Sequence, residues 1–307
     1  MPQVELRKRA LDILCLSQLD EKIAQTLALA EVLKNQVGQT EQGTPTWRVD
    51  PQAVLQAPPH VELPARPSRP EWVDHTQVAR RSPKTLAGRA ALIHSIAHIE
   101  FNAINLALDA VWRFADMPPS YYTDWLTVAV EEATHFSLLR QHLKSLHLRP
   151  MAVPPGLRAI PQDEWQEVPE QGWDYGDFPA HGGLWQMCER TADDVVARMA
   201  LVPRTMEARG LDATPLIQAK LRQIGTADAL AACDILDIVL RDEIGHVAIG
   251  NRWYAWTCAR AGWEPVAHYA VLTQRHQAPK MKPPFNRTAR LQAGFSETEL
   301  SWLNGQN

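Results

Sequence analysis

Two copies of a Glu-x-x-His motif constrain this chain more than any other feature of its sequence. They are Glu132-Ala-Thr-His135 and Glu243-Ile-Gly-His246, and each lies inside a long stretch with helical periodicity. Residues three apart on a helix share one face, so each motif directs a carboxylate and an imidazole towards a common point. Chance yields roughly 0.6 such motifs in a chain of this composition. The context of the two motifs must therefore decide what they mean.

The surrounding sequence predicts an all-α fold built on four long helical segments. These segments cover about 85–114, 121–147, a stretch starting near 184, and 227–261. A short turn at Asp116–Pro119 joins the first two, whereas a long connection, 150–182, rich in Pro, Gly and Trp, joins the second to the third. Short, long and short connections in this order are typical of a four-helix bundle with one long crossover. Strand signals are nearly absent.

Prolines divide the rest of the chain. Residues 1–44 are predicted as an N-terminal helical segment, and 45–84 as a proline-rich arm packed on the bundle. The bundle itself is assigned to 85–262. Residues 263–307 again contain prolines and are predicted as an irregular C-terminal extension.

Carboxylates lie at the centre of the apolar stripes of three predicted helices. They are Glu100, Glu132 and Glu243. Burying an unpaired carboxylate is costly, so each must be neutralised, paired or bound to a metal. The midpoint between Glu100 and Glu132 is residue 116, inside the predicted turn. An antiparallel hairpin that turns there brings these two carboxylates to the same height.

The third helix offers two candidates for a further carboxylate, Glu189 and Glu207. They are 18 residues apart, which is five full turns, so they share one face of a continuous helix. Gly210 and Pro215 resemble helix-stop signals and favour Glu189 on pattern alone. If Glu207 is the partner, the helix must continue past Gly210 with a distortion that begins near Pro203.

A second carboxylate precedes each motif directly: Glu131 before Glu132, and Asp242 before Glu243. A residue one step along a helix points about 100° away, towards a neighbouring helix. It can then accept the outer N–H of the histidine on that helix and fix its tautomer. We therefore predict the pairs Asp242 with His135 and Glu131 with His246; plain surface charges are the alternative.

Four segments of the chain resemble a known family. They read YGDFPAHGGLW (175–185), RMALVPRTMEARGLD (198–212), RDEIGHVAIGNRWYAW (241–256) and PFNRTARLQAGF (284–295). They are similar to the ferritin-like family catalogued as domain of unknown function 455, and the resemblance spans roughly residues 80–300. Glu207-Ala-Arg209 is also similar to a ligand-bearing Glu-Ala-Arg of the bacterial tRNA hydroxylase that oxidises the isopentenyl group of a modified adenosine. The resemblance therefore favours Glu207 over Glu189.

Two Glu-x-x-His motifs and one Glu from each of two other helices form the di-iron or di-manganese site of ferritin-like bundles. The predicted ligands are Glu100, Glu132, His135, Glu207, Glu243 and His246. Ligation rich in carboxylates favours two iron ions, with manganese as the alternative, and disfavours zinc. We expect an O₂-dependent oxidase or hydroxylase of an organic substrate. The alternative is a ferroxidase or metal-handling protein without an organic substrate.

The composition places few limits on partners. The net charge is −4 and no apolar run is long enough to cross a bilayer, so we expect no membrane partner. The N-terminus lacks a signal peptide, which favours the cytoplasm. The basic residues of 265–292 could contact tRNA phosphates: Arg275, Lys280, Lys282, Arg287 and Arg290. A solvated basic tail is the alternative interpretation.

The expected substrate is therefore a small molecule or a modified nucleoside in tRNA. An electron-donating reductase is the expected protein partner, and a homodimer is left open. The cysteines at 15, 188, 233 and 258 lie far apart without a CxxC motif. Disulfides and a zinc–thiolate site are therefore not expected.

Overall fold

The computed structural model describes residues 4–34, 47–149 and 152–305, and most of these lie in helices. The helices are α1 (Leu6–Leu14), α2 (Leu19–Leu27), α3 (Leu29–Lys34), α4 (Leu86–Arg113), α5 (Pro119–Ser145), α6 (Gly183–Arg190), α7 (Val195–Leu201), α8 (Ala208–Ile224), α9 (Ala227–Ala261), α10 (Pro265–Arg275), α11 (Arg287–Gln292) and α12 (Glu297–Gly305), with a 3-10 turn η1 (Glu164–Glu167) and a π-helix η2 (Val202–Glu207). One parallel pair, β1 (Val4–Glu5) with β2 (Trp47–Arg48), forms the sheet. The predicted all-α class is confirmed.

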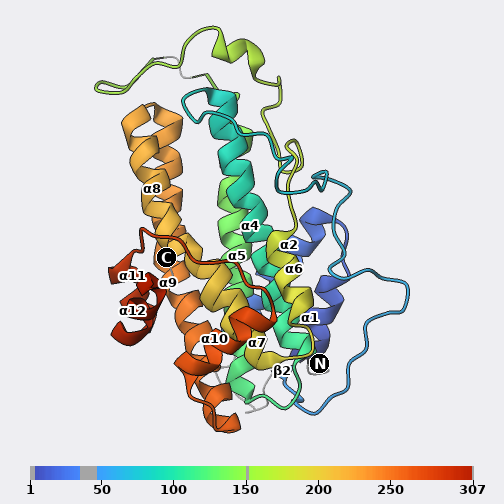
Figure 1. Cartoon of the computed structure of the whole chain (residues 1–307). Coiled ribbons are helices and arrows are strands. Elements are labelled where there is room, and N and C mark those ends of the chain that lie inside the picture. The colour runs from blue at the N-terminus through green and yellow to red at the C-terminus, as the bar shows by residue number, and fades with distance from the viewer. Residues whose placement is uncertain (1–3, 35–46, 150–151, 306–307) are drawn as a thin grey trace.

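The long helices α4, α5 and α9 and the segment α7–η2–α8 form the centre of the molecule (Figure 1). Helix α4 packs along α5, while α5, α7 and α8 all pack on α9. Three of the four predicted segments correspond to single helices, and α9 begins and ends where the periodicity predicts.

The predicted turn between the first two helices is confirmed. Helix α4 begins after Thr85, whose side chain accepts the N–H of Gly88 as an N-cap. After α4, Asp116 adopts a left-handed conformation with φ of 59°. Helix α5 then begins at Pro119, where the missing N–H of proline costs no helical hydrogen bond.

The third predicted helix is broken. Helix α6 ends at Arg190, and a turn separates it from α7. The π-helix η2 follows, with Pro203 at its start. Inside it, the hydroxyl of Thr205 donates to the carbonyl of Ala200 at 2.8 Å. The sequence predicts a distortion near Pro203 if the helix continues past Gly210, and the π-helix lies at that position.

Gly210 and Pro215 do not end the helix, so that expectation is wrong. Helix α8 runs through both of them. A proline inside a helix leaves the carbonyl four residues earlier without its usual donor. Here that carbonyl belongs to Leu211, and the Nδ2 of Asn286 donates to it at 3.1 Å. A residue of the C-terminal extension thus supplies the hydrogen bond that Pro215 removes.

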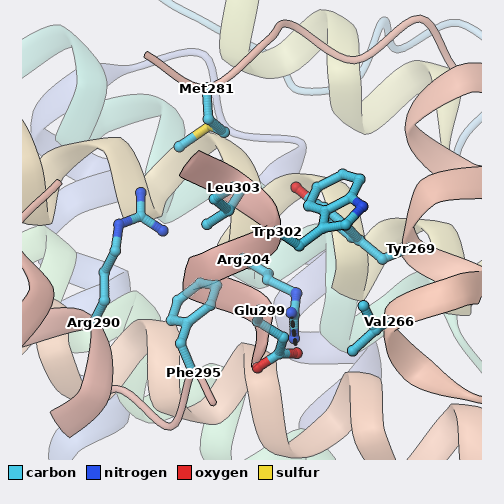
Figure 2. A pocket seen from close by; sticks show the side chains of 9 residues that line it. All are labelled: Arg204, Val266, Tyr269, Met281, Arg290, Phe295, Glu299, Trp302 and Leu303. Carbon is cyan, nitrogen blue, oxygen red and sulfur yellow. Dashed lines mark hydrogen bonds and ion pairs between the residues drawn. The ribbon is translucent and has the colours of Figure 1, made fainter. Parts of the chain in front are cut away.

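The sequence predicts an irregular C-terminal extension. This prediction is wrong, because α10, α11 and α12 lie within the extension. It packs against η2 and α8. Buried Arg204 of η2 forms an ion pair with Glu299 and lies over the rings of Tyr269 and Phe295, at 5.1 and 4.9 Å from their centroids (Figure 2). The extension therefore holds the π-helix in place.

The N-terminal helices and the proline-rich arm cover the other side of the bundle. Helix α1 packs on α4, and α2 packs on α5. Buried Arg7 donates to the carbonyl of Trp112 at the end of α4 and to that of Ala53 in the arm, both at 2.9 Å. Residues 35–44 of the predicted N-terminal segment and 45–46 of the arm lie outside the described residues. The domain boundaries stay predictions.

Helix α4 is the one helix, in the described part of the chain, that is long and apolar enough to cross a membrane. It meets this criterion by length and mean composition, although polar and charged residues interrupt its apolar sequence. However, 72% of its most apolar window is buried inside the protein. The core helix of a soluble protein has the same composition.

The four cysteines are free, as expected.

Candidate metal centre

The carboxylates and imidazoles of the two motifs meet in the buried centre of the bundle. Glu100, Glu132 and His135 form one group of donor atoms, and Glu132, Glu243 and His246 form a second. Within each group, one donor atom per residue lies within 4.8 Å of the others. Glu132 belongs to both groups, so α4, α5 and α9 contribute to one continuous centre that could bind metal.

The Nδ1 atom of each imidazole points at carboxylate oxygens. His135 Nδ1 lies 3.3 Å from Glu132 Oε2 and 3.6 Å from Glu100 Oε2. His246 Nδ1 lies 2.9 Å from Glu132 Oε1 and 3.2 Å from Glu243 Oε2. The two imidazole rings are 5.8 Å apart. Glu132 therefore lies between the two histidines, with one oxygen towards each.

The outer nitrogen of each histidine contacts the carboxylate predicted for it. His135 Nε2 lies 3.1 Å from Asp242 Oδ2, and His246 Nε2 lies 2.7 Å from Glu131 Oε2. Both predicted pairs are confirmed as hydrogen bonds. An ionised carboxylate accepts a hydrogen bond only from a nitrogen that carries a proton. The two contacts therefore assign a proton to each Nε2. In a neutral imidazole this leaves the lone pair of Nδ1 aimed into the centre.

Glu207 belongs to neither donor group, but it is buried within electrostatic reach of Glu243 and Glu132. Both carboxylate oxygens of Glu207 are buried and have no hydrogen-bond partner. Burial, followed by the negative charges of Glu243 and Glu132, raises its pKa well above the usual range. Glu189 is exposed at the end of α6 and accepts the indole N–H of Trp185 at 2.9 Å. Glu207 is thus the third-helix carboxylate near the centre; its role as a ligand stays a prediction.

The close packing of η2 on α9 explains how Glu207 reaches this position. A Cβ atom at Gly250 of α9 would lie 2.5 Å from the Cβ of Pro203, closer than any real contact. The missing side chain therefore makes room for the proline ring. Because a π-helix widens the turn, it changes the direction of the residues that follow it. Glu207 is the last residue of η2.

Residues 15–149 and 165–301 match the sequence model of a family described as "Protein of unknown function (DUF455)". The chain belongs to this family. It is also 44% identical over 252 residues to an uncharacterized protein of Haemophilus influenzae, an alignment that covers 80% of this chain and 78% of that protein. No solved structure matches it significantly. The DUF455 match includes all the predicted ligands.

Burial and mutual charge set the proton affinities of this DUF455 centre. Burial and the neighbouring Glu132 raise the pKa of Glu100 well above its usual range. Burial would also raise the pKa of Glu132, but hydrogen bonding with Glu100 and the charge of His246 outweigh it and lower that pKa. Hydrogen bonds with Glu100 and Glu132 likewise outweigh burial at His135 and raise its pKa to about 11. These shifts favour protons on Glu100 and His135 and an ionised Glu132, so protons and cations compete for the centre.

Gly250 and Asn286 help to position this centre in the DUF455 chain, but neither is among the residues predicted from the sequence. Gly250 lies one turn after His246 inside a helical pattern, and an interior glycine is itself a signal of close packing. Asn286 has no comparable signal. It lies in the PFNRTARLQAGF segment, which attaches to α8 through Asn286 and through Arg290, whose Nη2 is 2.6 Å from Asp212 Oδ2.

The basic patch predicted for the tail is smaller than its sequence suggests. Arg290 is buried against Asp212, and Arg287 forms an ion pair with Glu297. Arg290 is therefore unavailable to an anionic partner, and Arg287 is available only beside the opposing charge of Glu297.

Proposed function

We propose that this DUF455 chain is a non-haem di-iron protein, with manganese as the alternative metal, on a ferritin-like four-helix scaffold. We further propose that it is an O₂-dependent oxidase or hydroxylase of an organic substrate. The orientation of the two imidazoles carries this proposal. Each turns Nε2 outward to a carboxylate and Nδ1 inward to Glu132, which the two donor groups share.

The residues present fit two divalent cations. In the part of the chain that the structure describes, no Lys or Arg pairs with Glu100, Glu132, Glu207 or Glu243. Four buried carboxylates without a cationic side chain match the charge of two divalent ions. Within each group, one donor atom per residue lies within 4.8 Å of the others, so each group could hold one ion.

The type of donor supports iron or manganese. Four carboxylates and two imidazoles form a hard, oxygen-rich set, and none of the free cysteines belongs to it. Glu132 would contribute to holding both ions, because it has one oxygen near each histidine and belongs to both donor groups. Glu207, whose oxygens have no other partner, would complete the set beside Glu243. Two such ions, when bound, supply the two electrons that reduce O₂ for oxidation of a substrate.

The chain's own residues would orient the ligands and exclude water. Asp242 and Glu131 hold the imidazoles in the tautomer that presents Nδ1. Apolar side chains on the ligand faces of α4, α5 and α9 are buried next to the carboxylates: Ile96, Ala103, Val128, Leu139 and Val239. Exclusion of water from the site strengthens each electrostatic contact and prevents side reactions with water.

Metal analysis of the reconstituted protein tests the proposal. We expect two iron ions per chain, and fewer than one iron or manganese ion per chain would overturn the di-metal assignment. Glu207→Ala should lower the stoichiometry, whereas Glu189→Ala should leave it unchanged. Turnover of an organic substrate with electrons from a cytoplasmic reductase is the expected activity. Stoichiometric oxidation of ferrous iron without any organic substrate would instead favour a ferroxidase.

A further inference from the structure

An exposed stripe of α4 lies beside the metal centre. Successive residues of a helix are 100° apart, so Ile99 lies between the directions of His98 and Glu100. Glu100 points into the centre, and His98 is buried on the other side, with Nε2 3.2 Å from the carbonyl oxygen of His181. Ile99 itself is 51% exposed. The stripe therefore has the metal centre along one edge and His181 along the other.

The segment that carries Glu207 continues into α8, which reaches the metal centre at Glu243. Figure 1 shows α8 and α6 on opposite sides of α4. Gly210 of α8 has no side chain to cover Glu243, whose Oε1 lies 3.7 Å from an ideal Cβ built at that glycine. The Glu243 side chain is 10% exposed, while that of His246 is fully buried. Solvent therefore reaches the centre at this carboxylate rather than at its histidine.

One guanidinium and two imidazole side chains surround the stripe. Arg209 is exposed, and no ion pair involving it exists among the described residues. Burial lowers the pKa of His181, and charges at His75 and Arg209 lower it further, so Arg209 lies within electrostatic reach of this imidazole. His181 is therefore neutral at pH 7 and can contact an anion by donating a hydrogen bond. The rings of His75 and His181 are 6.5 Å apart. One opposing charge is present, because Asp74 Oδ1 lies 3.4 Å from His75 Nδ1.

We propose that Arg209, His181 and His75 form a binding surface for the anionic group of the organic substrate, whose apolar part lies on Ile99. The substrate class is thus a small amphiphilic anion, with a carboxylate or phosphate joined to an apolar chain. A guanidinium binds both groups through paired hydrogen bonds. The proposal rests on the proposed function, since it places the apolar part beside Glu100 and Glu243.

Position distinguishes Arg209 from an ordinary solvated charge. Lys220 is also exposed on α8 and also has no ion-pair partner among the described residues. It lies eleven residues later, three turns along the same face, and therefore far from the metal centre. Lys220→Gln is thus a matched control for Arg209→Gln, because both changes remove one positive charge from the same helix.

Calorimetric titration of the metal-loaded protein tests the proposal with four probes: decanoate, decyl phosphate, decanol and inorganic phosphate. We expect a decyl anion to bind to the wild type and to Lys220→Gln alike, and about tenfold more weakly to Arg209→Gln. Ile99→Ser should weaken the decyl anions and leave inorganic phosphate unchanged. The tighter of the two decyl anions identifies the headgroup. Equal binding of decanol and the anions, or an equal loss in Lys220→Gln, would overturn the proposal.

Two further measurements separate this inference from the proposed function. Arg209→Gln should keep the metal stoichiometry of the wild type, because Arg209 is not a ligand. If the wild type binds fewer than one metal ion per chain while Arg209 still controls anion binding, the di-metal function fails and the anion surface stands. A short single-stranded RNA is added to the protein with decanoate bound. If the RNA displaces decanoate and binds more tightly than decanoate does, the assignment to a small anion is overturned.

Discussion

Replacing Glu207 by methionine should stabilise the metal-free protein. Both carboxylate oxygens of Glu207 are buried without a hydrogen-bond partner, and an unsatisfied buried polar group costs about 1–3 kcal/mol. Burial and the charge of Glu243 raise its pKa, so protonation removes the charge but not this cost. Methionine fills the same space without polar oxygens. A gain of about 2 kcal/mol corresponds to an increase in Tm of roughly 3 °C for a chain of this length.

With metal present, the order of stabilities should invert. A ligand that binds only the folded state stabilises it by about 2.7 kcal/mol at a hundred times its Kd. The wild type gains this stabilisation, whereas Glu207→Met lacks one ligand and gains less. Scanning calorimetry with EDTA and with Mn²⁺ measures both effects. Glu189→Met, at an exposed position, is the control that should alter neither. A destabilised metal-free Glu207→Met protein, or one that keeps the full increase in Tm with Mn²⁺, would refute the reasoning.

Two other perturbations test the centre, and a third tests Lys22, which is buried between α2 and α4. Asp242→Asn removes the charge that orients His135 and should weaken Mn²⁺ binding about tenfold in competition with a chelator, while the protein stays folded by circular dichroism. Burial opposes protonation of His135, but hydrogen bonds with Glu100 and Glu132 raise its pKa to about 11, so metal must displace a proton. Mn²⁺ should therefore bind more tightly at pH 8 than at pH 6, with proton release seen by calorimetry in buffers of different ionisation enthalpy. Burial lowers the pKa of Lys22 to about 7, so the unfolded chain binds more protons between pH 7 and 9, and the free energy of unfolding should rise over that range. Urea titrations should show this rise, at most about 2.7 kcal/mol, in the wild type relative to Lys22→Met.

Periodicity alone predicts the α4–α5 hairpin and the position of α9, because these helices are long and end at strong signals. Asp116 in a left-handed conformation and Pro119 at a first helical position are local features of the sequence. The outer hydrogen bonds follow from the same regularity. The fixed angle between successive residues places Asp242 towards His135 once α5 and α9 are neighbours.

The path of the third helix could not be predicted in this way, because the features that permit it are distant in sequence. Pro203 fits against α9 only because residue 250 is a glycine, and Pro215 is accommodated because Asn286, 75 residues beyond Leu211, donates to the carbonyl that the proline leaves free. No local window contains these partners. A π-helix is an unfavourable segment that persists where the surrounding structure supports it. Here Arg204 and Thr205 tie it to the C-terminal extension, and it ends at Glu207, whose own carboxylate has no partner. The contacts around η2 thus hold a buried carboxylate in place although the carboxylate itself has no partner. We infer that the fold maintains the position of Glu207 at the expense of local helix stability.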